Sequence, residues 1–316
     1  MPYTKIIIMK RTVLAIVIIA VIAVIGIALF LLAGKKLAGP GGAPGGTIRI
    51  VAAEDFYGNI AAQIAGDKAN VLSIISNPNI DPHEYDATVQ DGIAVAQADI
   101  VIENGLNYDT WMDKLIGASP NPSRTVIVAG TTPGVAVLPE NPHVWYGISN
   151  MAAVAQAIAH ALAAKDPGDE AMFAANLKAF DASLAPIAAS MDAIKAAYAG
   201  TPVALTETIY RYQTGPMGLR VLTPATFERA IAEGNDPSAQ DVSAVNAEIA
   251  GMQAKILIYN SQTITPVTTN IENAAIANGI PVVPVTETMP TGDTYQSWMA
   301  GQLATLQAAL AKAAGK

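Results

Sequence analysis

Two of the three histidines in this 316-residue chain share a local pattern that suits metal binding. His83 lies in DPHEYD and His143 lies in NPHVW, so each follows an Asx-Pro pair. Proline fixes its own φ and pushes the residue before it to extended backbone, which sets the path of the chain into each imidazole. A ligand that is ordered in advance loses less entropy when an ion binds. The alternative is that both are surface histidines in ordinary Asx-Pro turns.

Two glutamates complete a candidate set of metal ligands. Glu207 closes one short apolar run and Glu287 closes another. Each histidine follows such a run and each glutamate ends one, and the four runs are predicted as strands: 71–76, 135–138, 202–207 and 281–287. Parallel sheets bind ligands beyond the carboxyl ends of their strands, so these side chains are predicted to meet at a divalent ion. For either glutamate alone, the alternative is a solvated carboxylate or a charge at a helix N-terminus.

The rest of the chain predicts the scaffold. Short Val/Ile-rich runs alternate with amphipathic segments in both halves, which is typical of a parallel sheet with helices on both faces. Between the halves lie two helical stretches, 149–165 and 169–200, and Pro186 is expected to kink or interrupt the second. The predicted fold is therefore α/β, with two mainly parallel lobes joined by one long rigid helix. Its boundaries are 47–167 for the first lobe, 168–199 for the connecting helix and 200–316 for the second lobe.

The N-terminus predicts a membrane segment. Residues 12–33 are apolar without a charge, which is enough for a helix to cross a bilayer and longer than the apolar region of an ordinary signal peptide. Basic residues before them favour a cytoplasmic N-terminus. We predict an uncleaved signal anchor over 1–34, followed by a Gly/Pro-rich tether over 35–46. The alternative is a cleaved signal peptide, and in both cases the remainder is extracytoplasmic.

Composition excludes several kinds of site. The chain has no cysteine, which rules out disulfides, thiol nucleophiles, cysteine–zinc sites and a lipid-modified cysteine. Five of the 18 basic residues precede position 47, so 13 basic and 26 acidic residues remain, a net charge of −13. This charge argues against nucleic acid and suits an exported protein that attracts cations, although solubility alone is the simpler explanation.

Several stretches in order resemble one known family, the zinc/manganese-type solute-binding proteins of ABC transporters (TroA-like, cluster A-I). They are DPHEYDATVQD with ADIVIENGLNYDTWMDKL, then NPHVW, ALTETIYRY and VTETMPTGDTYQSWM. The resemblance runs from Thr47 to the end. It implies two lobes, one rigid connecting helix and a single divalent ion between the lobes, held by His83, His143, Glu207 and Glu287.

The chain departs from the family pattern in three ways. Zinc-specific members usually have histidine where this chain has Glu207, and they often carry a histidine-rich loop that this chain lacks. The fourth ligand of the family is commonly aspartate, so Asp293 is the alternative to Glu287. Because carboxylate oxygens suit manganese better than imidazole does, we predict that manganese and zinc both bind, with manganese or iron(II) as the physiological cargo.

The expected function is extracytoplasmic capture of the ion and its delivery to an ABC permease, with no enzymatic step. Four protein ligands leave no open position for a reactive water. Binding requires neutral histidines and ionised carboxylates, so affinity should fall on acidification. One alternative is a metal-dependent hydrolase with Glu84 as general base, although the HExxH spacing is absent. Another is an adhesion domain that the metal only stabilises.

Overall fold

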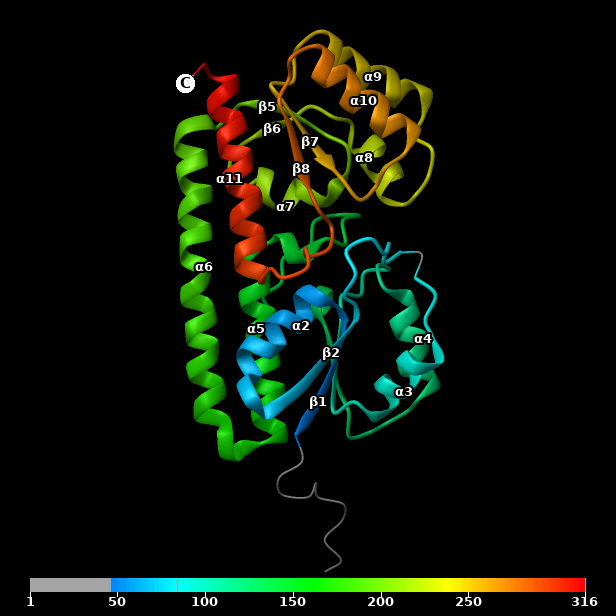
Figure 1. The fold of residues 1–316 in the computed structure, drawn as a ribbon, viewed down its shortest axis with the longest axis vertical. Helices are drawn as coiled ribbons and strands as arrows, with labels where there is room; N and C mark the ends of the chain where they lie inside the picture. The colour runs from blue at the N-terminus through cyan, green and yellow to red at the C-terminus, as the bar shows by residue number, and fades with distance from the viewer. Residues whose placement is uncertain (1–46, 84, 316) are drawn as a thin grey trace, which may run out of the picture. The chain divides into compact units, whose positions relative to one another are not determined.

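The computed structural model describes residues 47–83 and 85–315, which form two α/β lobes and a long helix (Figure 1). The predicted anchor over 1–34 and tether over 35–46 lie outside the described residues. Within the described ranges, no helix combines the length and the hydrophobicity needed to span a bilayer.

The first lobe is built on a four-stranded parallel sheet with the order β2-β1-β3-β4. Its strands are β1 (Ile48–Glu54), β2 (Ala69–Ile75), β3 (Ile100–Glu103) and β4 (Thr125–Val128). The central strand β3 has the sequence IVIE and is buried along its whole length. Such an uninterrupted apolar run is what a strand covered on both faces requires.

The second lobe repeats this design with the order β6-β5-β7-β8, again with all strands parallel. Its strands are β5 (Pro202–Leu205), β6 (Arg220–Val221), β7 (Ile256–Asn260) and β8 (Val282–Val285). In each sheet the chain runs from one strand to a neighbour on one side and then crosses to the other side. The carboxyl ends of the strands beside this reversal are the places where open α/β sheets bind ligands.

Helices surround the sheets. The helices of the first lobe are α2 (Asp55–Ala65), α3 (Val89–Gln97), α4 (Thr110–Ala118) and α5 (Ile148–Lys165). Those of the second lobe are α7 (Arg211–Thr214), α8 (Ala225–Ala232), α9 (Ala239–Ala250) and α10 (Pro266–Ala277). Two long helices, α6 (Glu170–Tyr198) and α11 (Tyr295–Ala313), lie side by side (Figure 1). Thr88, Thr265 and Thr294 open α3, α10 and α11 with capping boxes. Each of these threonines accepts a hydrogen bond from a backbone N–H that the helix itself leaves unpaired.

The helix α6 connects the lobes. Its 29 residues correspond to about 43 Å at 1.5 Å per residue, and it packs against α5, α2 and α11. Pro186 lies inside α6 on its exposed side, and the helix is not interrupted there. The expected break is therefore absent, because Pro186 faces solvent while Leu184 and Ile187 keep their buried contacts.

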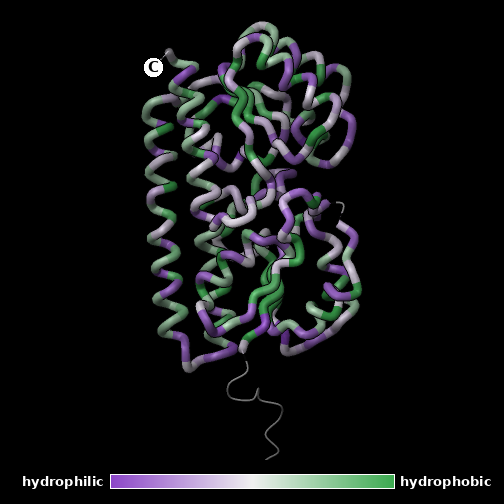
Figure 2. Tube along the Cα trace, in the orientation of Figure 1, coloured by the Kyte–Doolittle hydropathy of each residue, from purple (hydrophilic) through white to green (hydrophobic). Residues whose placement is uncertain are grey.

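One hydrophobic core extends through both lobes. It contains Phe56 and Trp145 from the first lobe together with Tyr210 and Trp298 from the chain after α6. Figure 2 shows the strands of both sheets as the most hydrophobic parts of the described chain. Direct hydrogen bonds add to this contact: Tyr146 Oη donates to the backbone oxygen of Thr286 at 2.6 Å. The lobes therefore share a packed interface.

One local expectation was wrong, and one short strand was not predicted. Residues 135–138 are not a strand, because side chains satisfy their backbone: Asn150 Oδ1 accepts from Ala136 N at 2.9 Å, and Tyr212 Oη accepts from Leu138 N at 2.9 Å. The stretch 228–253 is mostly helical, formed by the end of α8 and all of α9, and Gly234 with a φ of 69° lies between the two helices. The two-residue strand β6 was not predicted, since it is too short to leave a pattern.

Candidate metal centre

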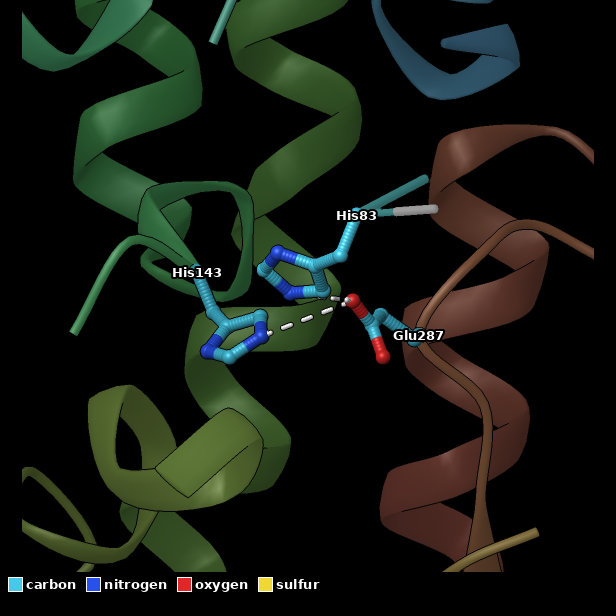
Figure 3. A group of neighbouring side chains, drawn as sticks. All are labelled: His83, His143 and Glu287. Atoms are coloured by element: carbon cyan, nitrogen blue, oxygen red, sulfur yellow. Dashed lines mark ion pairs between the residues drawn. The ribbon is translucent and has the colours of Figure 1, made fainter. Parts of the chain in front are cut away.

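The side chains of His83, His143, Glu207 and Glu287 lie close together between the two lobes. His143 Nε2 is 3.4 Å from Glu207 Oε1 and 3.6 Å from Glu287 Oε1, and His83 Nε2 is 3.7 Å from Glu287 Oε1. Figure 3 shows His83, His143 and Glu287 pointing toward one another. These three each offer a ligand atom within 4.8 Å of the other two, and Glu207 joins the group through its contact with His143.

The two Asx-Pro pairs set the histidines in the same way. Asp81 Oδ1 accepts a hydrogen bond from His83 N at 2.8 Å, and Asn141 Oδ1 accepts from His143 N at 3.1 Å. Each is an Asx turn, in which the side chain holds the backbone two residues ahead. The shared sequence pattern therefore corresponds to a shared local geometry. His143 does not follow a strand directly, however, and immediately precedes a single 3-10 turn over Val144–Tyr146.

His143 is fully buried, and its partners fix which nitrogen is free. Its Nδ1 lies 2.8 Å from Asn141 Oδ1, and that oxygen can only accept, so Nδ1 carries the proton. The other nitrogen, Nε2, is then a lone-pair donor that faces the two glutamates. Burial lowers the pKa of His143 below its ordinary value. The imidazole is therefore neutral at neutral pH, the form that a metal ion needs.

Both glutamates lie just beyond strands of the second sheet, Glu207 after β5 and Glu287 after β8. Both are nearly inaccessible, with side chains 1% exposed for Glu207 and 7% for Glu287. Burial, and next the negative charge of Glu287, raise the pKa of Glu207 to about 8. Burial also acts to raise the pKa of Glu287, but contacts with His143, His83 and Tyr108 outweigh it and lower that pKa to about 2. Of the two carboxyl groups, Glu207 is therefore the one that keeps a proton more readily.

Tyr108 is a site residue that sequence reasoning missed. Its Oη donates to Glu287 Oε1 at 2.9 Å, and its ring lies 4.7 Å from the His83 ring. Three residues with positive φ, Gly105, Leu106 and Asn107, turn the chain just before it. Asp109 holds this turn by accepting from the backbone N–H of Gly105 at 2.8 Å. The sequence NGLNYD does carry the turn signal, since asparagine and glycine tolerate left-handed backbone.

The unpaired atoms of the centre are suited to a cation. His143 Nε2 and Glu207 Oε1 are buried and have no hydrogen-bond partner among the described residues. Buried polar atoms without partners are uncommon and need an explanation. In a tetrahedral zinc site with bonds of about 2.0–2.2 Å, neighbouring ligand atoms lie about 3.3–3.6 Å apart. Three separations, from His143 to each glutamate and from His83 to Glu287, are 3.4 to 3.7 Å and lie close to that range.

Two cavities flank the centre and give it contact with solvent. One, of about 190 Å³, is lined by residues 78–82 and 261–264 and reaches Glu287. The other, of about 350 Å³, reaches His83 and Asn141. His83 is the most exposed of the four candidates, with 27% of its side chain accessible. His83 is therefore the candidate that an approaching ion can reach most readily.

Asp293 and His160 lie outside this cluster, whereas Trp145 packs against His143. Asp293 precedes α11 and accepts from Ser297 Oγ at 2.9 Å, outside the group of possible ligands. His160 is exposed on α5. Trp145 is fully buried, and its Nε1 donates to the backbone oxygen of Glu287 at 3.1 Å. Glu84, the general base of the hydrolase alternative, lies outside the described residues.

Comparison with known proteins agrees with this geometry. Residues 50–309 match the model of one protein family, described as zinc-uptake complex component A, periplasmic. Similar curated proteins include the metal ABC transporter substrate-binding lipoprotein SsaB of Streptococcus sanguinis, 33% identical over 42% of this chain and 47% of that protein. Another is the manganese ABC transporter substrate-binding lipoprotein PsaA of Streptococcus mitis, 32% identical over 46% and 50%. The chain spans about half the length of these relatives, and their names describe binding proteins rather than enzymes.

Solved structures share the fold. The periplasmic zinc-binding protein TroA from Treponema pallidum matches with a TM-score of 0.72 and 20% identity, over 84% of this chain and 99% of that one. The SBP FpvC from Pseudomonas aeruginosa, in complex with Mn2+, matches with a TM-score of 0.71 and 21% identity, over 84% and 99%. The likeness extends over both lobes and the long helix.

Proposed function

The chain belongs to the family of periplasmic zinc-uptake complex component A proteins, and on this basis we propose that it captures one divalent transition-metal ion outside the cytoplasm and delivers it to an ABC permease. The ion is manganese, zinc or iron(II), held by His83, His143, Glu207 and Glu287. The observation that carries the proposal is the convergence of these side chains between two lobes: His143 Nε2 lies 3.4 Å from Glu207 Oε1 and 3.6 Å from Glu287 Oε1, and His83 Nε2 lies 3.7 Å from Glu287 Oε1.

The choice of ions follows from the ligand types. Imidazole suits zinc and iron, and carboxylate oxygen suits manganese, so a mixed set accepts all three. We propose that manganese or iron(II) is the physiological cargo and that zinc competes for the same site. The names of the relatives support this range, since PsaA is described as a manganese protein and TroA as a zinc-binding one.

We propose further that residues 12–33 anchor the protein in the membrane. The curated relatives are named lipoproteins, whereas this chain has no cysteine to carry a lipid. The uncharged stretch is long enough to cross a bilayer. In this proposal a tether over 35–46 links the anchor to lobes at 47–167 and 200–316, which residues 168–199 join.

Metal analysis of His143→Ala, with His160→Ala as the matched control, tests the function. Wild-type protein and His160→Ala should each bind one equivalent of Zn²⁺ or Mn²⁺, because His160 is exposed on α5 and away from the centre. His143→Ala should lose stoichiometric binding, since it removes the most buried nitrogen ligand. One equivalent of tightly bound metal in His143→Ala would show that the ion binds elsewhere.

A further inference from the structure

Asn260 lies between the two candidate carboxylates. It is the last residue of β7, which runs between β5 and β8 in the second sheet, and it is 1% exposed. Glu207 follows the neighbouring strand on one side, and Glu287 follows the strand on the other. The topology of the sheet therefore places one neutral amide between two buried acids.

The amide donates to both glutamates. Asn260 Nδ2 lies 2.5 Å from Glu207 Oε2 and 3.2 Å from Glu287 Oε2. Its other end is fixed as well, because Asn260 Oδ1 accepts from the backbone N–H of Gln262 at 3.0 Å. This second bond defines which end of the side chain is nitrogen. Thr263 Oγ1 adds another donor to Glu207 Oε2, at 3.0 Å.

These bonds divide the oxygens of each glutamate into two kinds. The Oε2 atoms of both accept from Asn260, whereas the Oε1 atoms of both face His143. We propose that Asn260 is a positioning residue that sets the metal preference of the site, by restricting each glutamate to one oxygen for the ion. This inference rests on the proposed function.

The number of oxygens offered matters for the choice of ion. With one oxygen from each glutamate, the four side chains present two nitrogens and two oxygens, the four-coordinate set that zinc prefers. With both oxygens of each glutamate free, the same side chains would present two nitrogens and four oxygens. Manganese favours such oxygen-rich, six-coordinate surroundings. Asn260 therefore makes the site more selective for zinc over manganese than its ligands alone would be.

The test compares Zn²⁺ and Mn²⁺ affinities, measured separately by competition with a chelator, in four full-length proteins. They are wild type, Asn260→Leu, Thr263→Val and the control Asn278→Leu, whose side chain donates to Ala274 O at 2.8 Å at the end of α10. The Zn²⁺ Kd should rise by about tenfold or more in Asn260→Leu, as is typical when a group supporting a metal ligand is removed, and the ratio of the Mn²⁺ Kd to the Zn²⁺ Kd should fall. The ratio should fall less in Thr263→Val and stay unchanged in Asn278→Leu.

The visible spectrum of the Co²⁺-loaded proteins reports coordination independently of affinity. Tetrahedral Co²⁺ absorbs strongly and six-coordinate Co²⁺ weakly, so Asn260→Leu should lose intensity relative to wild type. An unchanged ratio with an unchanged spectrum would overturn the role of Asn260. If Asn260→Leu does not fold, an unchanged ratio in Thr263→Val is decisive against it. Failure of the proposed function is distinct, because wild type itself would then bind no stoichiometric metal.

Discussion

At the scale of single residues, the centre is defined by a conflict between charge and burial. Glu207 and Glu287 are both nearly inaccessible to solvent, and burial lowers the pKa of His143, the imidazole that both of them face. Two buried carboxylates so placed cannot both ionise without a counterion. A divalent cation would resolve the conflict, and on the proposed function its binding would displace the proton that the raised pKa of Glu207 favours.

Metal binding should therefore depend on pH through Glu207. The pKa of this carboxyl is raised to about 8, so below pH 8 the ion must displace a proton, and affinity should increase as pH rises from 6 to 8. Titration calorimetry at pH 7 in buffers of different ionisation enthalpy should show release of about one proton. As the pH falls, protonation of Glu207 should weaken metal binding first. Protonation of His143 should weaken binding only at lower pH, because burial lowers the pKa of His143.

Replacement of Glu207 by glutamine gives the control for this dependence. Glu207→Gln should bind metal more weakly and release no proton near pH 7, since the displaced proton is gone. Proton release that persists in Glu207→Gln would assign the titration to another group.

The sequence identified side chains that carry a local signal and missed those placed by tertiary structure. His83 and His143 could be found because an Asx-Pro pair precedes each. Asn260 is positioned by the order of strands in the second sheet, and nothing adjacent to it in the sequence indicates that neighbourhood. The ligand roles of the four candidates remain a prediction.

At the scale of elements, the long helix α6 tolerates a proline that costs it stability. Pro186 cannot donate a backbone hydrogen bond and clashes with the preceding turn. Because it is exposed, alanine can replace it without disturbing the core. Pro186→Ala should raise the free energy of unfolding by about 2 kcal/mol, the roughly 3 kcal/mol of helix propensity less the entropy that proline removes from the unfolded chain.

Urea denaturation of the metal-free protein measures this effect. Pro167→Ala is the matched control, because Pro167 opens the 3-10 turn Pro167–Asp169, a position where proline fits. That control should be neutral or destabilising. A Pro186→Ala protein no more stable than wild type would mean that the helix has already adapted to the proline.

Elements with strong patterns were predictable, and those stabilised by side chains were not. Buried runs such as IVIE in β3 have the composition of covered strands, and the alternation of strands and helices predicted both parallel sheets. Residues 135–138 have the same apolar composition but make their backbone hydrogen bonds to Asn150 and Tyr212. That outcome depends on residues distant in the sequence.

At the scale of the whole molecule, the first lobe buries acids that no cation pairs with among the described residues. Glu54 has both carboxylate oxygens buried without a hydrogen-bond partner, and burial raises its pKa well above the ordinary value. Burial likewise raises the pKa of Glu103 to about 8, that of Asp55 to about 7 and that of Asp109 to about 6. The folded protein therefore keeps protons that the unfolded chain releases at lower pH.

The stability of the metal-free protein should decrease as pH rises. An acid whose pKa is higher in the folded state stabilises fully below its unfolded value of about 4, and that contribution is lost as pH approaches the folded value. For these groups the loss falls between about pH 5 and pH 8. Thermal unfolding in the presence of a chelator should show a lower Tm at pH 8 than at pH 5.5. A Tm that increases over this range would contradict the burial of these acids.

The central claim is that four side chains from two lobes hold one ion. Anomalous diffraction from crystals of the Zn²⁺-loaded protein tests it most directly, because it locates the metal independently of the protein atoms. We predict a single interlobe peak with ligand atoms of His83, His143, Glu207 and Glu287 at about 2.0–2.2 Å. A peak elsewhere, or an interlobe peak that only one lobe coordinates, would contradict the account.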